Sequence, residues 1–530
     1  MALLALLTFT NLSMRLLGDA GIGWHIRTGQ LVLTTHAIPL VDPFSSSLGG
    51  HAWFAWEWLY DVLVGWLEKA AGLNGVALLT ALIIAACFSW TFRLLLRRRT
   101  NVLVALILVL LAASASMIHF LARPHVVSWL LTVAWFWILE SSEKECRGSH
   151  SNSSEDATIT RSRSWLLYWL PLLMLVWVNV HGGFLIGFVL LTIYWIRPAW
   201  EWLKLTLKLT EDRYEEVLRK IRAGRRVWDL TLAGALTAAA TLLNPYGFKL
   251  HLHIYHYLSN RFLMDHIDEF QSPNFHYVAQ KCFAGLLALT LVALVAKARE
   301  FRRVSASQGL LILFSVYSGL YASRNIPVTS LLLILLIGPW LSFAMERIPQ
   351  PQQTTARWRG LASTQFLRRM ETIELGLRGH LWSVAAVMLT CWIVMHGGGK
   401  LGTERLMDAH FDGKRFPVLA VDYLEKQGGQ GPILSPDYWG GYLIYRLYPR
   451  MRVVIDDRHD FYGEEFLKSY LKMMHLQPGW DDFLREHSAR CVLVPRNSAL
   501  ANILSETAAW QAIYSDDVAV AFVPAARKHE

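Results

Sequence analysis

Long apolar runs separated by short polar connections recur along most of the chain before residue 399. A helix needs roughly 20 apolar residues to cross a hydrocarbon core about 30 Å thick. The pattern therefore predicts an all-α polytopic membrane domain over residues 1–398, with about eleven spanning helices. These helices are expected near residues 1–17, 75–96, 102–121, 124–141, 164–180, 184–203, 228–244, 279–296, 308–322, 326–345 and 380–397.

The first two predicted spans are separated by a long connection, residues 18–74. Within it, residues 57–72 have apolar side chains at helical spacing but retain charged ones, among them Glu57, Asp61 and Glu68. Charged side chains disfavour a position in the hydrocarbon core, so this segment is expected to be an interfacial helix.

Lys and Arg residues are concentrated in alternate connections of the predicted membrane domain. They gather at residues 93–99, 142–163, 198–226, 297–303 and 346–378. Short cytoplasmic loops accumulate such residues, so the N-terminus is predicted to be cytoplasmic and residues 18–74 external. The formal net charge of +10 arises from these loops and gives no reason to expect a nucleic-acid partner. The predicted location is a bacterial inner (plasma) membrane, crossed several times.

From residue 399 to residue 530 the hydropathy falls and the periodicity changes. GPILSP, MRVVIDD, CVLVP and VAVAFVP are typical of buried strands, and amphipathic segments typical of helices separate them. Alternating strands and helices predict a soluble α/β domain, which the topology places outside the membrane, in the periplasm.

The composition agrees with a membrane protein and excludes several classes of site. Hydrophobic residues make up 54% of the chain, and the mean hydropathy is +0.31. The five Cys residues have no paired spacing that suggests a zinc site or a disulfide framework. No GxGxxG, GxxxxGK[ST] or HExxH pattern occurs, which counts against nucleotide-driven transport and against a zincin protease.

The connections assigned to the outer side contain most of the uncommon polar residues. They include Asp19, His25, Arg27, Asp42, Glu57, Arg123, Asn179, His181 and Arg324. Charged groups at helix ends also have a purely structural explanation, because membrane interfaces tolerate them. The inner connections contain plain runs of Lys and Arg, however, whereas the outer ones mix Asp, Asn, His and Arg with Gly and Pro. This asymmetry favours a polar cavity on the outer side.

Several of these segments resemble one superfamily of membrane enzymes. DAGIGWHIRTGQ, IPLVDPFS, WVNVHGG, NPYG and ASRNIP are similar to segments of a bacterial branch of GT-C-like proteins. An Asp directly after the first span, a long first external loop and a C-terminal external domain also resemble the GT-C glycosyltransferases. These include protein mannosyltransferases, aminoarabinose transferases and oligosaccharyltransferases. One departure is that Ala20 follows Asp19, so the Asp-Glu pair of the mannosyltransferases is missing.

The resemblance implies a sugar donor on a polyprenyl phosphate and a first-loop carboxylate that works near the acceptor or a bound metal. In this chain that role falls to Asp19, which is expected to be the general base that deprotonates an acceptor hydroxyl. Guanidinium groups bind phosphate in bidentate fashion. Arg123 and Arg324, followed by Arg27 and His25, are therefore the candidates for the donor phosphate.

Two further roles are left open between several residues. Asp42 or Glu57 could join Asp19 at a divalent cation such as Mg²⁺ or Mn²⁺, since hard cations take oxygen ligands, but no spacing makes this specific. Acidic residues at the carboxyl end of a strand lie where α/β sheets tend to bind ligands, which makes the IDDR segment a candidate. Contacts to the acceptor or to the sugar are expected from Asp42, Glu57, Asn179, His181, Asp456, Asp457 and Arg458.

The predicted function is an inverting glycosyltransferase at the outer face of the inner membrane. Its partners would be a polyprenyl-phosphate-linked sugar, a glycan, lipid or protein acceptor, and membrane lipids. A carrier or flippase for lipid-linked glycans is the second hypothesis, and a non-catalytic assembly protein is the third. Only the first requires Asp19.

Overall fold

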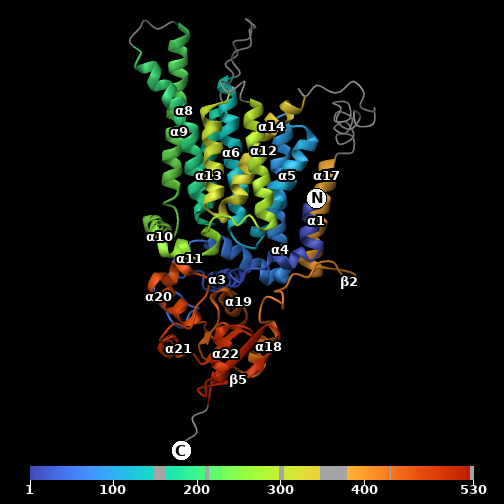
Figure 1. Cartoon of the computed structure of the whole chain (residues 1–530). Helices are drawn as coiled ribbons and strands as arrows, with labels where there is room; N and C mark the ends of the chain where they lie inside the picture. The colour runs from blue at the N-terminus through green and yellow to red at the C-terminus, as the bar shows by residue number, and fades with distance from the viewer. Residues whose placement is uncertain (148–162, 209–213, 298–303, 347–378, 430, 526–530) are drawn as a thin grey trace, which may run out of the picture.

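The computed structural model describes residues 1–147, 163–208, 214–297, 304–346, 379–429 and 431–525. A helical bundle is joined at one end to a smaller C-terminal domain (Figure 1). Three helices lie at the end of the bundle that meets this domain: α3 (Ile22–Thr35), α10 (Phe248–Ser259) and α11 (Arg261–His266). We call this end of the bundle the domain face.

Within the described residues, five helical segments are long and apolar enough to cross a membrane. They are α4 (Trp58–Arg97), Val102–His119 with α5 (Val102–Ser116), Gly182–Thr206 with α8 (Leu185–Thr206), α12 (Val278–Lys297), and Ser323–Met345, which forms most of α14 (Ile326–Glu346). Shorter apolar helices are Ser164–Val178, which includes α7 (Trp169–Val178), α13 (Ala306–Tyr321), and Leu381–Gly397 of α17 (Gly379–Gly397). These helices are typical of a multi-pass membrane protein, while the number of about eleven crossings stays a prediction.

Three of the predicted spans are not apolar helices of this kind. The first is divided into α1 (Ala2–Phe9) and α2 (Leu12–Leu16), the span expected at 124–141 lies in α6 (His125–Arg147), and that at 228–244 overlaps the second half of α9 (Tyr214–Ala240). Helix α1 is only 8 residues long, and α9 begins with a charged, solvent-exposed half. Length therefore separates α1 from the other spans, and polarity separates α9.

The predicted interfacial helix and the next predicted span follow each other directly in α4, with a kink between them at Gly72. Gly72 has a φ of 62°, a conformation that other residues rarely adopt. The first half of α4 packs against α3 at Gly29 and Gly65. A Cβ atom on Gly29 would lie 1.8 Å from the carbonyl oxygen of Asp61, so only glycine permits this approach.

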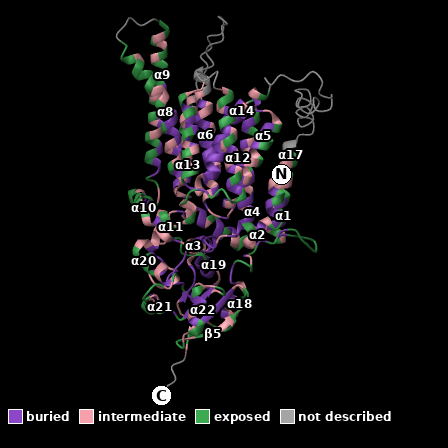
Figure 2. Ribbon diagram, in the orientation of Figure 1, coloured by how far each residue is buried: buried purple, intermediate pink, exposed green. Residues whose placement is uncertain are grey.

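Burial changes from the inside to the outside of the bundle (Figure 2). Residues 331–337 of α14 are at most 1% exposed. On α12, α13 and α17, by contrast, Leu291, Leu313 and Trp382 are 63%, 66% and 72% exposed. Large apolar side chains gathered on an outer surface are unfavourable in water and suit contact with lipid.

The C-terminal domain is built on a four-stranded sheet with the order β3-β4-β6-β5. Its members are β3 (Ile433–Leu434), β4 (Cys491–Pro495), β5 (Trp510–Ser515) and β6 (Ala519–Pro524); β3 and β4 are parallel, and the other pairs are antiparallel. The remaining elements are a small hairpin of β1 (Lys400–Leu401) and β2 (Glu404–Arg405), and the helices α18 (Val418–Lys426), α19 (Asp437–Leu447), α20 (His459–Met474), α21 (Asp481–Glu486) and α22 (Ala499–Glu506).

The predicted strands GPILSP, CVLVP and VAVAFVP are confirmed as β3, β4 and β6. The prediction of a strand in MRVVIDD was wrong, because only Val453 of that segment pairs. Val453 forms isolated bridges with Ile433 in β3 and with Ser45 in the first loop. This segment therefore joins the C-terminal domain to the membrane domain instead of extending the sheet.

Close contact between α19 and α3 fastens the two parts together. A Cβ atom on Gly441 would lie 2.3 Å from the carbonyl oxygen of Ala20, and one on Gly23 would lie 2.1 Å from that of Gly441. Arg27 also donates from Nε to the Tyr445 carbonyl oxygen over 2.8 Å. The C-terminal domain is thus held directly against the start of the first loop.

Candidate functional site

A cavity of about 860 Å³ lies between the domain face of the bundle and the C-terminal domain. Segments far apart in the sequence line it, including both ends of the first loop and the connections before α6, α8 and α14. The C-terminal domain contributes residues from the start of α19 and of α20. Among the residues singled out from the sequence, the cavity brings together Asp19, His25, Glu57, Arg123, His181, Arg324, Asp457 and Arg458.

Asp19, Arg123 and Asp457 meet in one cluster of charges. Asp19 Oδ1 accepts hydrogen bonds from the backbone N–H of Gly21 over 2.7 Å and from Arg123 Nη2 over 2.6 Å. The same guanidinium nitrogen donates to Asp457 Oδ2, and Trp24 Nε1 donates to Asp457 Oδ1 over 3.0 Å. Asp19 Oδ2 has no hydrogen bond within the described residues, so it is available to a ligand.

The charges in this cluster alter one another. Burial, with smaller contributions from Asp19 and Asp456, raises the pKa of Asp457 to about 6 despite the opposing effect of Arg123. Burial disfavours the charged form of Arg123, but Asp19 and Asp457 outweigh it and raise the pKa of the guanidinium. Arg123 Nε is buried and has no hydrogen-bond partner in the described chain. A cation with an unused donor beside a cavity is suited to bind an anion.

Arg324 approaches the cavity from the connection before α14. Its guanidinium carbon lies 4.4 Å from the centroid of the Phe270 ring, and Nη1 lies 3.6 Å from Glu269 Oε1. Burial would raise the pKa of Glu269, but Arg324 and then Arg123 outweigh it and lower the pKa to about 2. Arg324 donates no hydrogen bond to any described residue, which leaves its donors for an anionic group.

Two histidines lie on either side of Glu57. His25 is 1% exposed, and its Nδ1 is 2.5 Å from Asp61 Oδ1. His181 Nδ1 accepts from the backbone N–H of Gly183 over 3.0 Å. The Nε2 atoms of His25 and His181 lie 3.8 Å and 3.9 Å from the two carboxyl oxygens of Glu57.

Asp61 is a cavity residue that the sequence interpretation assigned only to an interfacial helix. It lies four residues after Glu57, a spacing that places two side chains on one face of a helix. This spacing was the feature of the sequence that could have identified Asp61 as a cavity residue. It could not show that His25, on a different helix, would pair with Asp61.

A second His–Asp pair comes from the C-terminal domain. His459 Nε2 lies 2.7 Å from Asp437 Oδ2, and Tyr470 donates its hydroxyl to Asp437 Oδ1 over 3.2 Å. Burial opposes the charge on both members, yet their pairing raises the pKa of His459 and lowers that of Asp437. The pairing therefore favours the charged forms of both residues in the cavity wall.

No protein-family model matches the sequence, and no curated protein matches it. Among solved structures, the chain is similar to the oligosaccharyltransferase of Archaeoglobus fulgidus in the apo form, with a TM-score of 0.54 and 10% identity over 98% of this chain and 72% of that chain. The same enzyme in complex with Zn and sulfate gives a TM-score of 0.51 over 93% of this chain and 67% of that chain. ArnT from Cupriavidus metallidurans gives a TM-score of 0.47 and 14% identity, over 98% of this chain and 95% of that chain.

The chain shares the fold of the A. fulgidus oligosaccharyltransferase, a GT-C-like architecture. The similarity to the oligosaccharyltransferase extends over nearly the whole chain and thus over both the bundle and the C-terminal domain. The expectation of a GT-C-like architecture is confirmed. At 10% identity this likeness concerns the fold, so the activity must be argued from the residues of the cavity.

Within this GT-C fold, three residues expected at the acceptor form a structural network instead. Arg458 donates from Nη1 to Asp42 Oδ1 over 2.8 Å and from Nη2 to Asp456 Oδ2 over 2.7 Å. Both carboxylates are at most 2% exposed and neither lines the cavity. Arg458 reaches the cavity wall, but its guanidinium is engaged with these two partners. The network fastens the first loop to the C-terminal domain.

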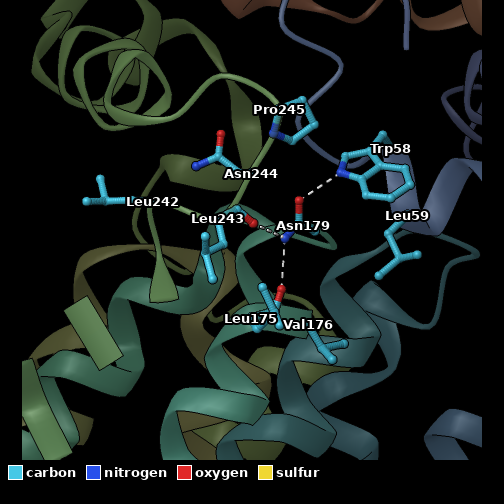
Figure 3. Close-up of a pocket in the computed structure, with 9 residues that line it drawn as sticks. All are labelled: Trp58, Leu59, Leu175, Val176, Asn179, Leu242, Leu243, Asn244 and Pro245. Carbon is cyan, nitrogen blue, oxygen red and sulfur yellow. Dashed lines mark hydrogen bonds between the residues drawn. The ribbon is translucent and has the colours of Figure 1, made fainter. Parts of the chain in front are cut away.

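Asn179 and Arg27 also lie outside the cavity lining. Asn179 lies in an apolar groove of about 570 Å³ beside the start of α4 (Figure 3). Its amide donates to the carbonyl oxygens of Leu175 and Leu243, and its Oδ1 accepts from Trp58 Nε1 over 2.8 Å. Arg27 is engaged with the C-terminal domain. Both side chains connect segments of the fold, because their polar atoms already have protein partners.

The residues suggested for a divalent cation do not converge. Asp19 pairs with Arg123, Asp42 with Arg458, and Glu57 lies between two imidazoles. In the part of the chain that the structure describes, no group of three or more His, Cys, Asp or Glu residues could hold a metal ion. Two of the three suggested ligands thus already have a cationic partner, and this donor set does not fit a Mg²⁺ or Mn²⁺ site.

Proposed function

We propose that the chain is an inverting glycosyltransferase that moves a sugar from a polyprenyl-phosphate carrier to an acceptor at the outer face of the membrane. The observation that carries this proposal is the free Oδ2 of Asp19 in a cavity that also contains Arg123 and Arg324. A carboxylate and two guanidinium groups are what base-assisted displacement of a phosphate requires. The GT-C fold supports the same reaction class.

The chemistry assigns one task to each charged group. Asp19 Oδ2 takes the proton of an acceptor hydroxyl while the hydroxyl oxygen bonds to the anomeric carbon of the sugar. The bond from that carbon to the phosphate oxygen breaks, and the electron pair leaves with the carrier phosphate. Attack from the face opposite the phosphate inverts the anomeric centre. Arg324 and Arg123 stabilise the negative charge that the phosphate gains.

The comparisons support an anion site without naming the acceptor. One structure of the A. fulgidus oligosaccharyltransferase is a complex with Zn and sulfate, and another is tethered to an acceptor peptide. Sulfate has the shape and charge of a phosphate group. For this chain the acceptor is a glycan, a lipid or a protein. No step is assigned to a divalent cation, because the carboxylates of the cavity do not gather as ligands.

Transfer can be tested directly with the purified protein. It would be incubated with a panel of polyprenyl-phosphate sugars, and released or transferred sugar would be measured by mass spectrometry. We expect turnover of one class of donor. Movement of intact donor across a vesicle membrane without cleavage would instead support a carrier.

Replacing Arg324 by Gln is expected to weaken donor binding. Hydrogen bonds to a charged group contribute about 1.5–3 kcal/mol, so the KM for the donor should rise roughly 10- to 100-fold. Arg324→Lys should retain part of the affinity because the charge remains. The control is Arg261→Gln, because Arg261 is on the same side and its side chain is 93% exposed. An unchanged donor KM in Arg324→Gln would place the phosphate elsewhere.

The proposed orientation predicts the location of two fused reporters. A periplasmic reporter joined after Glu530 should be active, because the C-terminal domain and the cavity lie on one side of the bundle. A cytoplasmic reporter inserted within residues 142–163 should be active because basic loops remain in the cytoplasm. Reversed activities would contradict the orientation.

A further inference from the structure

Glu57 has a buried carboxyl group that makes no hydrogen bond to the part of the chain that the structure describes. The residue is 9% exposed and lies directly before α4, with its side chain in the cavity lining. No described residue makes a hydrogen bond to its carboxyl oxygens, and the nearest nitrogens are the imidazole Nε2 atoms at 3.8 Å and 3.9 Å. Buried polar groups are nearly always hydrogen-bonded to protein or to water, so a carboxyl that faces a cavity without a protein partner is available to a ligand.

The two imidazoles beside Glu57 are each held in place from behind. His25 is paired at Nδ1 with Asp61, and its ring is stacked on Trp24 with 3.6 Å between centroids. His181 Nδ1 accepts the Gly183 N–H and lies 2.8 Å from Ser128 Oγ. The Nε2 atom of each ring is left for a ligand. Such prior fixation reduces the entropy lost when a ligand binds.

The partner of His181 assigns a hydrogen-bonding role to its free nitrogen. Because His181 Nδ1 accepts from Gly183, the proton of the neutral ring is on Nε2, which is a donor. His25 Nδ1 pairs with Asp61 Oδ1, which leaves the Nε2 of that ring for a ligand. Glu57, when protonated, adds one donor and one acceptor. Donor and acceptor groups therefore lie close together in this part of the cavity.

Burial favours the uncharged form of each of these three groups. Burial raises the pKa of Glu57 to about 8, overcoming the opposing effect of Arg123. Burial also lowers the pKa values of His25 and His181, with smaller contributions from neighbouring cations. This part of the cavity is therefore neutral, whereas the region around Asp19, Arg123 and Arg324 is charged.

Aromatic side chains border the neutral region. Trp24, Trp53 and Trp56 all line the same cavity. A Cβ atom on Gly182 would lie 3.1 Å from the Trp56 ring, so the glycine lets Trp56 pack closely beside His181. Pockets of this kind combine apolar walls with a few well-placed polar groups. A sugar ring has matching properties, with apolar C–H faces and hydroxyl groups at its edge.

We propose that Glu57, His25 and His181 bind the hydroxyl groups of an uncharged sugar, and that the donor therefore carries a neutral hexose or pentose. This rests on the proposed function and specifies its sugar. Each hydroxyl both donates and accepts, as the three side chains require. An ammonium group only donates and would leave the protons of Glu57 and His181 unpaired. A carboxylate would bury a negative charge beside three groups whose uncharged forms are favoured, which is costly without a cationic partner among them.

The proposal is tested by equilibrium binding, which does not depend on turnover. Radiolabelled polyprenyl-phosphate donors with a neutral hexose, the corresponding 2-amino sugar or a hexuronic acid would be titrated against the full-length protein in lipid nanodiscs. We expect the neutral donor to bind about tenfold or more tightly than either charged one. Glu57→Gln keeps one donor and one acceptor and should bind within about threefold of wild type, whereas Glu57→Ala should lose about tenfold or more.

The controls separate the sugar site from the fold and from the reaction. Glu465→Ala alters a side chain that is 88% exposed and should bind as wild type does. Thermal unfolding of Glu57→Gln should be unchanged or shifted upward, because the carboxyl has no partner to lose. Equal binding by Glu57→Ala and wild type, preference for a charged sugar, or no binding of any donor would overturn the proposal. Selective binding of the neutral donor without transfer would retain it and contradict the transferase instead.

Discussion

Replacing Asp19 by Asn is expected to lower kcat for sugar transfer by roughly 10²- to 10⁴-fold, the usual contribution of a general base. An amide cannot take the acceptor proton, but its oxygen can still accept from the Gly21 N–H and from Arg123. The fold and the donor affinity should therefore remain. The measurement is product formation with the active donor, followed over time by mass spectrometry.

The matched control for Asp19→Asn is Asp265→Asn. Asp265 lies in α11, also on the domain face, and its side chain is 60% exposed; among the described residues it pairs only with the exposed Arg261. Surface pairs of this kind contribute little, so its activity should equal that of wild type. Undiminished turnover in Asp19→Asn would remove Asp19 as the base, and Asp457 would then be the next carboxylate to test.

Replacing Arg458 by Met should destabilise the protein by about 3–5 kcal/mol. The substitution leaves Asp42 and Asp456 buried without their shared cation, and the uncompensated charges account for the cost. Asp456 would keep two hydrogen bonds, one from the Tyr462 hydroxyl over 2.9 Å and one from the backbone N–H of residue 458 over 3.0 Å. The free energy of unfolding would be measured in a denaturant titration followed by circular dichroism.

Arg485→Met is the control for this stability measurement. Arg485 is 69% exposed and pairs with Asp481 and Asp482 on the surface of α21. Its loss should change the free energy of unfolding by less than about 0.5 kcal/mol. Equal unfolding of the two variants would mean that the Arg458 network does not hold the first loop to the C-terminal domain.

Much of the architecture was predictable because hydropathy and turn residues act over contiguous stretches of chain. The apolar runs predicted the long helices α4, α5, α8, α12 and α14, and the change in periodicity predicted β3, β4 and β6. The prediction of a strand at residues 451–457 was wrong, because this segment makes only isolated bridges at Val453, one of them to Ser45 in the first loop. Such a contact leaves no trace in local periodicity.

The sequence predicted where the candidate site lies better than it predicted which side chains contact one another there. Assigning the polar connections to one side predicted that Asp19, Arg123 and Arg324 would share a cavity, and the structure places them together. The same argument also selected Asp42 and Asn179, whose polar atoms are already used within the fold. Sequence position shows which side a residue occupies but not which partner neutralises it.

The sequence by itself determined the membrane class of the protein, the alternation of strands and helices after residue 399, and the side on which its polar residues gather. These properties depend on neighbouring residues along the chain. Only the tertiary structure decided that Arg123 pairs with Asp19 and also with Asp457, which lies 334 positions after Arg123, and that Arg458 neutralises Asp42 across 416 positions. The physical reason is that charge pairing and burial act through space and follow from packing, here including the close approach of Gly23 to Gly441.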